Sequence, residues 1–341
     1  MRIIITGAGG YIGQGLGQAL LAGRFDGVSV TQLVLNDVKP LSSTTIDSRV
    51  RYVPGSLGDA DTLNALFAEP VDWVFHLAGI TSRQAEEDLA LGLQVNLLAT
   101  VAMLERLRTQ AVPPRLVFTS SIGVFGAPLP SVIDDSTLVQ PALSYGTQKR
   151  MAELLIADYA RRGHVDGRAV RLPGVIARPP QPQKAMSAFS SDILQELAAG
   201  RPYTCPVSPE ASNWLISLPC CLEQLIHAAR SPAPSWPASR VVTLPAQRVT
   251  TGVLVSALEA HLARPLAHLV TWAPQPAIEA QFGNWPPLRT EAADHIGFCH
   301  DGTPERLVAR ALAAPLATVT SSQEQPLSTQ DFSTDQGDKN A

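Results

Sequence analysis

The segment MRIIITGAGGYIGQGLGQALLAG constrains the fold of this chain most, because it joins a strand, a glycine-rich turn and a helix. The apolar, β-branched run MRIIIT predicts a strand. Gly7, Gly10 and Gly13 follow at three-residue spacing. Glycines allow a tight strand-to-helix turn and a close approach of the backbone to a pyrophosphate, which the helix N-terminus then faces. The spacing departs from the usual Gly-x-Gly-x-x-Gly, and a purely structural turn is the alternative, but the strand before it and the helix after it favour dinucleotide binding.

Asp37 indicates which dinucleotide the turn would bind. It ends a second predicted strand, QLVLND, 24 residues after Gly13. An acid at this place in dinucleotide-binding folds binds the adenosine ribose hydroxyls and repels a 2′-phosphate. The position therefore favours NAD over NADP. Lys39 is a counter-signal, and a solvated loop acid is the alternative interpretation.

Strands and helices alternate through the first half of the chain. The expected strands are 1–6, 32–37, 50–55, 71–79, 115–121 and 167–173, and the expected helices lie near 60–68, 85–108 and 146–162. This alternation predicts an α/β fold with a Rossmann-type doubly wound parallel sheet. Ligands of such sheets bind at the carboxyl ends of the strands.

The second half of the chain predicts a different organisation. A proline-rich segment at 177–187 ends an NAD-binding domain expected at 1–178. Residues 179–317 are expected to form mainly a small C-terminal substrate-binding region, from which 219–246 return to the sheet as a helix and a strand. Residues 318–341 are polar and aperiodic, and predict a disordered tail.

Composition excludes several classes of function. The chain has 341 residues and a formal net charge of −4, which gives no basic footprint for nucleic acid. No apolar run is expected to be long enough to span a membrane, and a strand from Arg2 leaves no room for a signal peptide. The four cysteines and seven histidines show no metal-ligand spacing. We therefore expect a cytoplasmic protein with reduced thiols and no metal.

Tyr145 and Lys149 are the first candidates for catalytic residues. They lie four residues apart in SYGTQKRMAELL, so both project from one face of a helix. An ammonium beside a phenol favours the phenolate, which is a usable general base. Ser121 ends the fifth strand, 24 residues before Tyr145. Taken singly, the three are a capping serine, a core tyrosine and a surface lysine; behind a dinucleotide loop they predict one catalytic group.

With these motifs the chain resembles the extended short-chain dehydrogenase/reductase family, which includes nucleotide-sugar epimerases and dehydratases. The matching runs are TGAGGYIG, HLAG, VNLLAT, SSIGVFG and SYGTQK, together with Asp37. The resemblance implies that Ser121, Tyr145 and Lys149 are catalytic and that Ser120 is structural. It implies an NAD site lined by Gly7, Gly10, Tyr11, Ile12, Gly13, Asp37, Ser56, Leu57, Leu77, Ala78, Gly79, Asn96, Tyr145, Lys149, Pro173 and Val175. Ser56 stands where the family usually has an aspartate that contacts adenine.

Longer runs, among them SYGTQKRMAELLIADYARRGHVDGRAVRLPGVIARP, are similar to family members that oxidise the C2 hydroxyl of a four-carbon sugar acid with NAD. The chain lacks the Arg-Asp pair that would hold a nucleotide-sugar diphosphate. It also has Ser212 and Pro219 where the sugar-acid enzymes carry arginines. Arg83 and Arg178 remain as candidate anion contacts, with surface arginines as the alternative.

The leading hypothesis is an NAD-dependent dehydrogenase of a small polyhydroxy acid. The alternatives are a sugar epimerase or dehydratase with tightly held NAD, and a non-catalytic NAD-sensing protein. The weaker candidates for substrate contact are Thr81, Ser82, Arg83, Ser121, Arg178, Ser187, Phe189 and Trp214. The resemblance also implies a homodimer through helices 93–108 and 146–162. The apolar residues expected there are Leu97, Leu98, Val101, Leu104, Met151, Leu154, Leu155 and Ile156.

Overall fold

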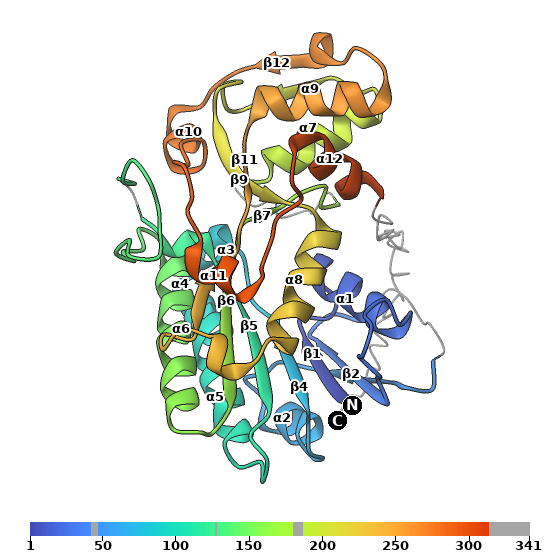
Figure 1. The fold of residues 1–341 in the computed structure, drawn as a ribbon, viewed down its shortest axis with the longest axis vertical. Helices are drawn as coiled ribbons and strands as arrows, with labels where there is room; N and C mark the ends of the chain where they lie inside the picture. The colour runs from blue at the N-terminus through green and yellow to red at the C-terminus, as the bar shows by residue number, and fades with distance from the viewer. Residues whose placement is uncertain (42–46, 127, 180–186, 314–341) are drawn as a thin grey trace, which may run out of the picture.

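A seven-stranded sheet organises the lower part of the molecule (Figure 1). The computed structural model describes residues 1–41, 47–126, 128–179 and 187–313, so the predicted tail lies outside the described residues. The strands are β1 (Arg2–Thr6), β2 (Gln32–Asp37), β3 (Val50–Pro54), β4 (Trp73–His76), β5 (Arg115–Ser121), β6 (Asp166–Leu172) and β10 (Val241–Thr243). Their order is β10-β6-β5-β4-β1-β2-β3, and every pairing is parallel. This order confirms the predicted doubly wound sheet.

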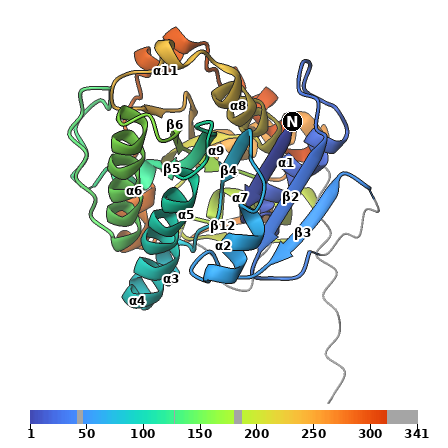
Figure 2. The ribbon, with the colours of Figure 1, turned by 90° about the horizontal axis from the view of Figure 1, so that it is seen from below.

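The sheet is buried on both faces, and the sequence of β1 shows why. Ile3 and Ile5 belong to one core cluster, whereas Ile4 belongs to another. Alternate side chains of a strand point to opposite faces, so an unbroken isoleucine run needs helices on both sides. The first cluster is completed by α1 (Tyr11–Leu21) and α8 (Leu218–Arg230), and the second by α2 (Ala60–Leu66), α5 (Ala99–Leu107) and α6 (Ser144–Arg161). Figure 2 shows α5 and α6 on the side of the sheet away from α8.

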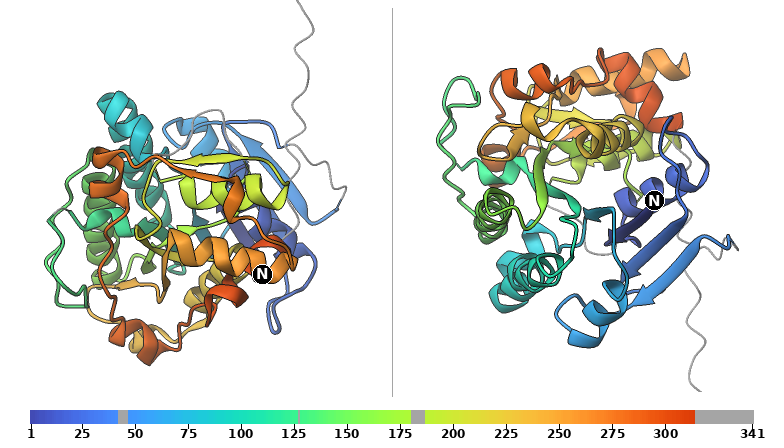
Figure 3. Two further views of the ribbon diagram at one scale, coloured as in Figure 1. Left: turned by 90° about the horizontal axis from the view of Figure 1, so that it is seen from above. Right: turned by 60° about the horizontal axis from the view of Figure 1, so that its bottom comes forward.

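A second part covers the carboxyl ends of the strands (Figures 1 and 3). A three-stranded sheet contains β7 (Gly174–Val175), β9 (Ser212–Ile216) and β11 (Gln247–Thr250), and a two-stranded sheet contains β8 (Tyr203–Cys205) and β12 (Val270–Trp272). Its helices are α7 (Phe189–Ala198), α9 (Thr251–Leu262), α10 (Pro276–Phe282) and α12 (Pro304–Ala313). The apolar faces of α7, α9 and α12 share one core. Short 3₁₀ turns occupy Ile122–Val124, Ala233–Ser235 and Ala267–Leu269.

The chain passes more than once between the two parts. After β9 it returns to the first sheet as α8 and β10, and β10 pairs with β6. Helix α11 (Glu291–Ile296) also joins the first core, through Ala293. The second part therefore rests on the first through shared elements, and the boundaries at 178 and 317 stay a prediction.

The region expected as one helix at 85–108 is divided. It consists of α3 (Ser82–Glu87), α4 (Leu89–Gly92), a π-helical turn (Leu93–Leu98) and α5. A continuous helical stretch, Leu89–Leu107, has 19 residues and a mean hydropathy of 1.2. By length and composition alone this stretch could cross a bilayer, a test that the core helices of globular proteins also pass. Met103, Leu104 and Leu107 nevertheless pack on the sheet, as core helices do.

Candidate active site

The turn between β1 and α1 can contain only glycine at two positions. Gly7 has a φ of +71°, and a Cβ there would lie 2.6 Å from the backbone nitrogen of Ala78. A Cβ on Gly13 would lie 2.3 Å from the carbonyl oxygen of Gly7. Gly10 caps α1 without a side-chain hydrogen bond, so the first amides of the helix have no side-chain acceptor. These close approaches fit the pyrophosphate of a dinucleotide, whose oxygens need bare backbone N–H groups.

Asp37 lies directly beside this turn. Its carboxylate accepts hydrogen bonds from the backbone N–H groups of Gly9 (2.9 Å) and Lys39 (3.0 Å). The hydroxyl of Ser56 accepts from the N–H of Gly58 at 3.1 Å, and Leu57 is buried in the core below. The predicted ribose acid is therefore held at the end of β2 next to the glycine turn, where a negative charge opposes a second phosphate.

Asn96 braces the end of β4 from the π-helical turn. Its Oδ1 accepts from the N–H of Ile80 at 2.9 Å, and its Nδ2 donates to Oε1 of Gln148 at 2.7 Å. A Cβ on Gly79 would lie 3.0 Å from the Asn96 Oδ1 and 3.5 Å from the Lys149 Nζ. Asn96 thus connects the predicted adenosine and nicotinamide segment Leu77–Gly79 to α6. A π turn widens the helix locally, and such turns are frequent at functional sites.

Ser121, Tyr145 and Lys149 meet where β5 ends against the first turns of α6. The Ser121 hydroxyl lies near enough to the Tyr145 phenol to lower its pKa, and it accepts from the N–H of Gly123 at 3.0 Å. The Lys149 Nζ donates to the carbonyl of Thr119 at 2.9 Å and lies 5.7 Å from the centre of the Tyr145 ring. The structure therefore brings together the three residues that the sequence pattern proposed as one group.

The electrostatics of this group differ from the expectation. Burial raises the pKa of Tyr145, and the effects that oppose it are the nearby Ser121 hydroxyl and the positive charge of Arg178. Burial also lowers the pKa of Lys149 to about 8, opposed by the charge of Glu153. Lysine was expected to lower the tyrosine pKa, but its own charge is costly here because it is buried. The cation that acts on the phenol in this structure is Arg178.

Arg178 is positioned by a strained turn. Ala177 precedes it with a φ of +57°, a left-handed conformation that is rare for a residue with a Cβ. The Tyr11 hydroxyl lies 3.3 Å from the carbonyl oxygens of Ile176 and Ala177, and the Gln195 side chain donates to the carbonyls of Ala177 and Arg178. Burial raises the pKa of Tyr11 to about 12, and Arg178 opposes that shift as well. Tyr11 therefore links the glycine turn to the segment that presents Arg178.

The other candidate arginine has a partner. Arg83 forms an ion pair with Glu87 at 2.8 Å on the exposed face of α3. Thr81 caps the same helix in a capping box with Gln84, and Ser82 is its first residue. Arg178 has no carboxylate partner among the described residues, so it is the better candidate for an anionic substrate.

The aromatic candidates are packed inside the protein. Trp214 is fully buried, donates to the carbonyl of Pro286 at 2.7 Å and contacts Phe125 and Trp285 edge-on or tilted. Phe189 is buried in the core of the second part, and Ser187 is exposed beside it. Pro173 and Val175, the predicted neighbours of the nicotinamide, are buried where β6 leads into β7. Trp214 and Phe189 are therefore core residues of the second part, and neither presents a ring face to solvent.

Glu153 was not selected from the sequence. It is fully buried one turn after Lys149 and binds Ser120, Arg171 and Arg150. A glutamate four residues after a lysine on a helix normally indicates an exposed ion pair, so only the side-chain burial distinguishes it.

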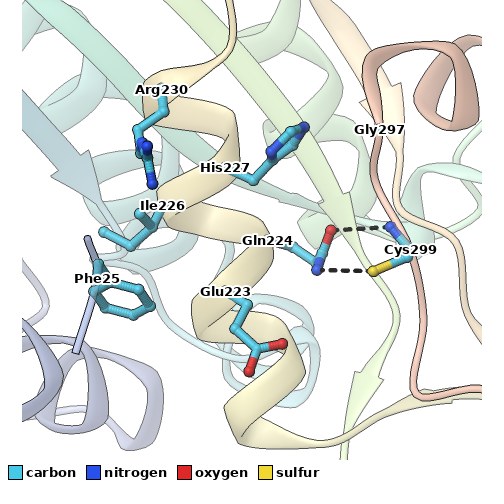
Figure 4. Close-up of a pocket in the computed structure, with 8 residues that line it drawn as sticks. All are labelled: Phe25, Glu223, Gln224, Ile226, His227, Arg230, Gly297 and Cys299. Carbon is cyan, nitrogen blue, oxygen red and sulfur yellow. Dashed lines mark hydrogen bonds between the residues drawn. The ribbon is translucent and has the colours of Figure 1, made fainter. Parts of the chain in front are cut away.

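A cavity of about 290 Å³ lies elsewhere, along α8, and includes none of these residues (Figure 4). Its wall contains Cys299, whose N–H and sulfur both contact the Gln224 amide. Within the described residues no three His, Cys, Asp or Glu side chains are grouped to hold a metal ion, and the four cysteines are free thiols.

Comparison with known proteins places this geometry in a family. The NAD dependent epimerase/dehydratase family matches residues 3–211. D-erythronate dehydrogenase from Cupriavidus necator is 38% identical over 314 residues, covering 90% of this chain and 97% of the relative. The D-erythronate dehydrogenase from Haemophilus influenzae is 42% identical over 259 residues, covering 76% and 81%.

A solved structure shows the same fold. The structure of a nucleoside-diphosphate-sugar epimerase from Agrobacterium tumefaciens aligns with a TM-score of 0.83 at 33% identity, over 90% of this chain and 92% of that one. Together the comparisons confirm the fold class, the family resemblance and NAD as the cofactor.

Proposed function

The chain belongs to the NAD-dependent epimerase/dehydratase family, and from this we propose that it is a dehydrogenase that oxidises the C2 hydroxyl of a small, D-erythronate-like polyhydroxy acid to the 2-keto acid. Relatives named as dehydrogenases of a sugar acid, similar over most of the chain, support an NAD-dependent oxidoreductase. The observation that carries the proposal is the grouping of Ser121, Tyr145 and Lys149 at the end of β5, with the charge of Arg178 near enough to lower the pKa of Tyr145. A hydroxy acid needs a base for its hydroxyl proton and a cation for its carboxylate.

The roles of the residues follow from their contacts. Tyr145 takes the proton of the substrate hydroxyl as general base, since the Ser121 hydroxyl already lies near its phenol. Ser121 shares the same oxygen and orients it. NAD, when bound, accepts the hydride from the carbinol carbon. Lys149 would hold the nicotinamide ribose, because its Nζ lies beside Gly79, the last residue of the segment Leu77–Gly79, and beside Thr119.

Arg178 is proposed to bind the substrate carboxylate. Its charge lowers the pKa of both Tyr145 and Tyr11, one on the catalytic helix and the other beside the glycine turn. Ser212 is buried and donates to the carbonyl of Trp285, and Pro219 lies in the first turn of α8. Neither Ser212 nor Pro219 carries a positive charge, so Arg178 is the candidate that we propose for the anion contact.

The experiment is a screen of four- to six-carbon aldonic acids with NAD, followed by NADH absorbance, with erythritol as the matched substrate that lacks a carboxylate. We expect D-erythronate to exceed erythritol in kcat/KM by about 10- to 150-fold, which corresponds to a charge-assisted contact of about 1.5–3 kcal/mol. Arg178→Gln should remove that preference. Because the charge of Arg178 also lowers the pKa of Tyr145, erythritol turnover should fall as well, but by less than D-erythronate turnover. Equal kcat/KM for the acid and the polyol would contradict the proposal.

The same screen separates the alternatives. An epimerase or dehydratase returns the hydride to its substrate, so it would convert a sugar nucleotide without releasing NADH. A non-catalytic NAD sensor would bind NAD and turn over neither class. The intact Ser121, Tyr145 and Lys149 group supports a catalytic role.

We also propose a homodimer through the helices beside the catalytic group. Leu98 is 50% exposed, Met151 43% and Leu154 55%, and Leu89 and Leu91 on the adjoining α4 are exposed too. Of the other residues expected in the same interface, Leu104 and Ile156 instead pack on the sheet, and Leu97 is buried. Exposed leucines on neighbouring helices favour a partner surface. The cytoplasmic location stays a prediction.

A further inference from the structure

The carboxylate of Glu153 is the most heavily hydrogen-bonded buried acid beside the catalytic group. Its Oε1 accepts from the Ser120 hydroxyl at 2.6 Å and from the Arg171 Nε at 2.9 Å. Its Oε2 accepts from the Arg171 Nη2 and the Arg150 Nη1, each at 2.9 Å. The side chain is fully buried, whereas that of Arg150 is 32% exposed. A buried carboxylate that accepts four hydrogen bonds fixes the position of the groups around it.

These bonds tie three elements together at one level of the sheet. Ser120 on β5 is paired in register with Arg171 on β6, and Glu153 on α6 binds both. Ser120 directly precedes Ser121, and Glu153 lies one helical turn after Lys149. These hydrogen bonds therefore fix the position of α6 along β5, and with it the distance between the Ser121 hydroxyl and the Tyr145 phenol.

The charge of Glu153 matters because Lys149 is buried and forms no ion pair with any residue that the structure describes. The elements packed on the ammonium group supply the Phe118 ring at 4.6 Å and the Thr119 carbonyl from β5, neutral His76 from β4, and the Tyr145 ring from α6. Burial lowers the pKa of His76 to about 3, helped by Lys149, so it carries no charge at neutral pH.

Glu153 is the nearby group whose charge raises the pKa of Lys149, against the burial that lowers it to about 8. Arg171 and Arg150 reach Lys149 only through the carboxylate that they share. Removing that carboxylate would leave two unpaired cations beside a third.

We propose that Glu153 is a positioning residue of the dehydrogenase, which holds Lys149 as an ammonium ion and aligns Ser121 with Tyr145. The inference rests on the proposed function for the role of Lys149, but its test uses NAD affinity, which needs no substrate. A failed substrate screen would therefore leave this test intact.

The experiment measures NAD affinity by calorimetry from pH 6 to 10. Wild-type affinity should fall as Lys149 loses its proton, with a midpoint near pH 8. Glu153→Gln keeps the shape and removes the charge, and should lower the midpoint by at least about 1 unit. At pH 8 the charged fraction of Lys149 would then fall from about a half to about a tenth, so affinity drops roughly fivefold.

Two matched variants separate charge from structure. Ser120→Ala removes one neutral hydrogen bond to the same carboxylate and should lower the melting temperature without moving the midpoint. Glu105→Gln removes a 43% exposed carboxylate that bonds α6 through Tyr159, and should also leave the midpoint unchanged. A Glu153→Gln midpoint equal to wild type, or an equal shift in Ser120→Ala, would overturn the proposal.

Arg150→Gln keeps the test decisive if Glu153→Gln does not fold. Arg150 is partly exposed, so its loss should be tolerated, and it removes a cation that partly neutralises Glu153. The midpoint should then move upward. A midpoint that stays or falls would contradict the role of Glu153 charge.

Discussion

Gly7→Ala tests whether the strand-to-helix turn needs its close backbone approach. The substitution adds one carbon at a φ of +71°, 2.6–2.8 Å from the backbone of Leu77 and Ala78. Left-handed backbone costs an L-residue roughly 1–2 kcal/mol, and a less flexible unfolded chain returns about 0.4–1 kcal/mol. The clash adds about 1–3 kcal/mol, because backbone rather than a flexible side chain must move. The expected loss of unfolding free energy is about 2–4 kcal/mol.

Gly163→Ala is the matched control. Gly163 has nearly the same φ, +74°, but a Cβ there would meet nothing within 4 Å. It should therefore lose only about 1 kcal/mol by urea denaturation and bind NAD normally. Gly7→Ala should in addition bind NAD at least about tenfold more weakly, equivalent to 1.4 kcal/mol. If both variants lose the same stability and both retain NAD affinity, the contact with Ala78 is not what requires glycine.

Tyr145→Phe should bind NAD nearly as well as wild type but lose about 10²–10⁴-fold in kcat, because only the proton acceptor is removed; near-normal kcat would exclude the phenol as base. Asp37→Ser should raise the ratio of kcat/KM for NADP to that for NAD, because the carboxylate no longer opposes a 2′-phosphate; an unchanged ratio would place Asp37 away from the ribose. Leu98→Glu with Leu154→Glu should halve the mass seen by light scattering, whereas Val112→Glu, at a 76% exposed position elsewhere, should not; a monomeric wild type would refute the interface.

Local patterns predicted the elements that depend on neighbouring residues. The strand, glycine turn and helix at Gly7–Gly13 follow from short-range sterics, and the pairing of Tyr145 with Lys149 follows from helical spacing. The meeting of Ser121 with Tyr145 was also predictable, because a doubly wound sheet brings a strand end to the next helix.

Contacts between distant segments were not predictable in the same way. Whether Glu153 is buried depends on the register of Ser120 with Arg171, which a helix pattern does not contain. Ala177 adopts the left-handed conformation although it is not a glycine, so nothing in the sequence indicated the turn that precedes Arg178. The expected effect of Lys149 on Tyr145 considered the charge of the lysine alone, whereas burial is the largest influence on the pKa of both groups.

The chain crosses between the two parts several times, so the core of the first part depends on segments that come after strands of the second part in the sequence. Separate crossings occur where β6 meets β7, where β9 leads into α8, where β10 leads into β11, and on both sides of α11. Helix α8 and strand β10 lie after β9 in the sequence, yet they complete the core and the edge of the first sheet. The first 178 residues are therefore not a complete folding unit. A fragment cut after 178 would expose the face of Ile3 and Ile5 that α8 now covers.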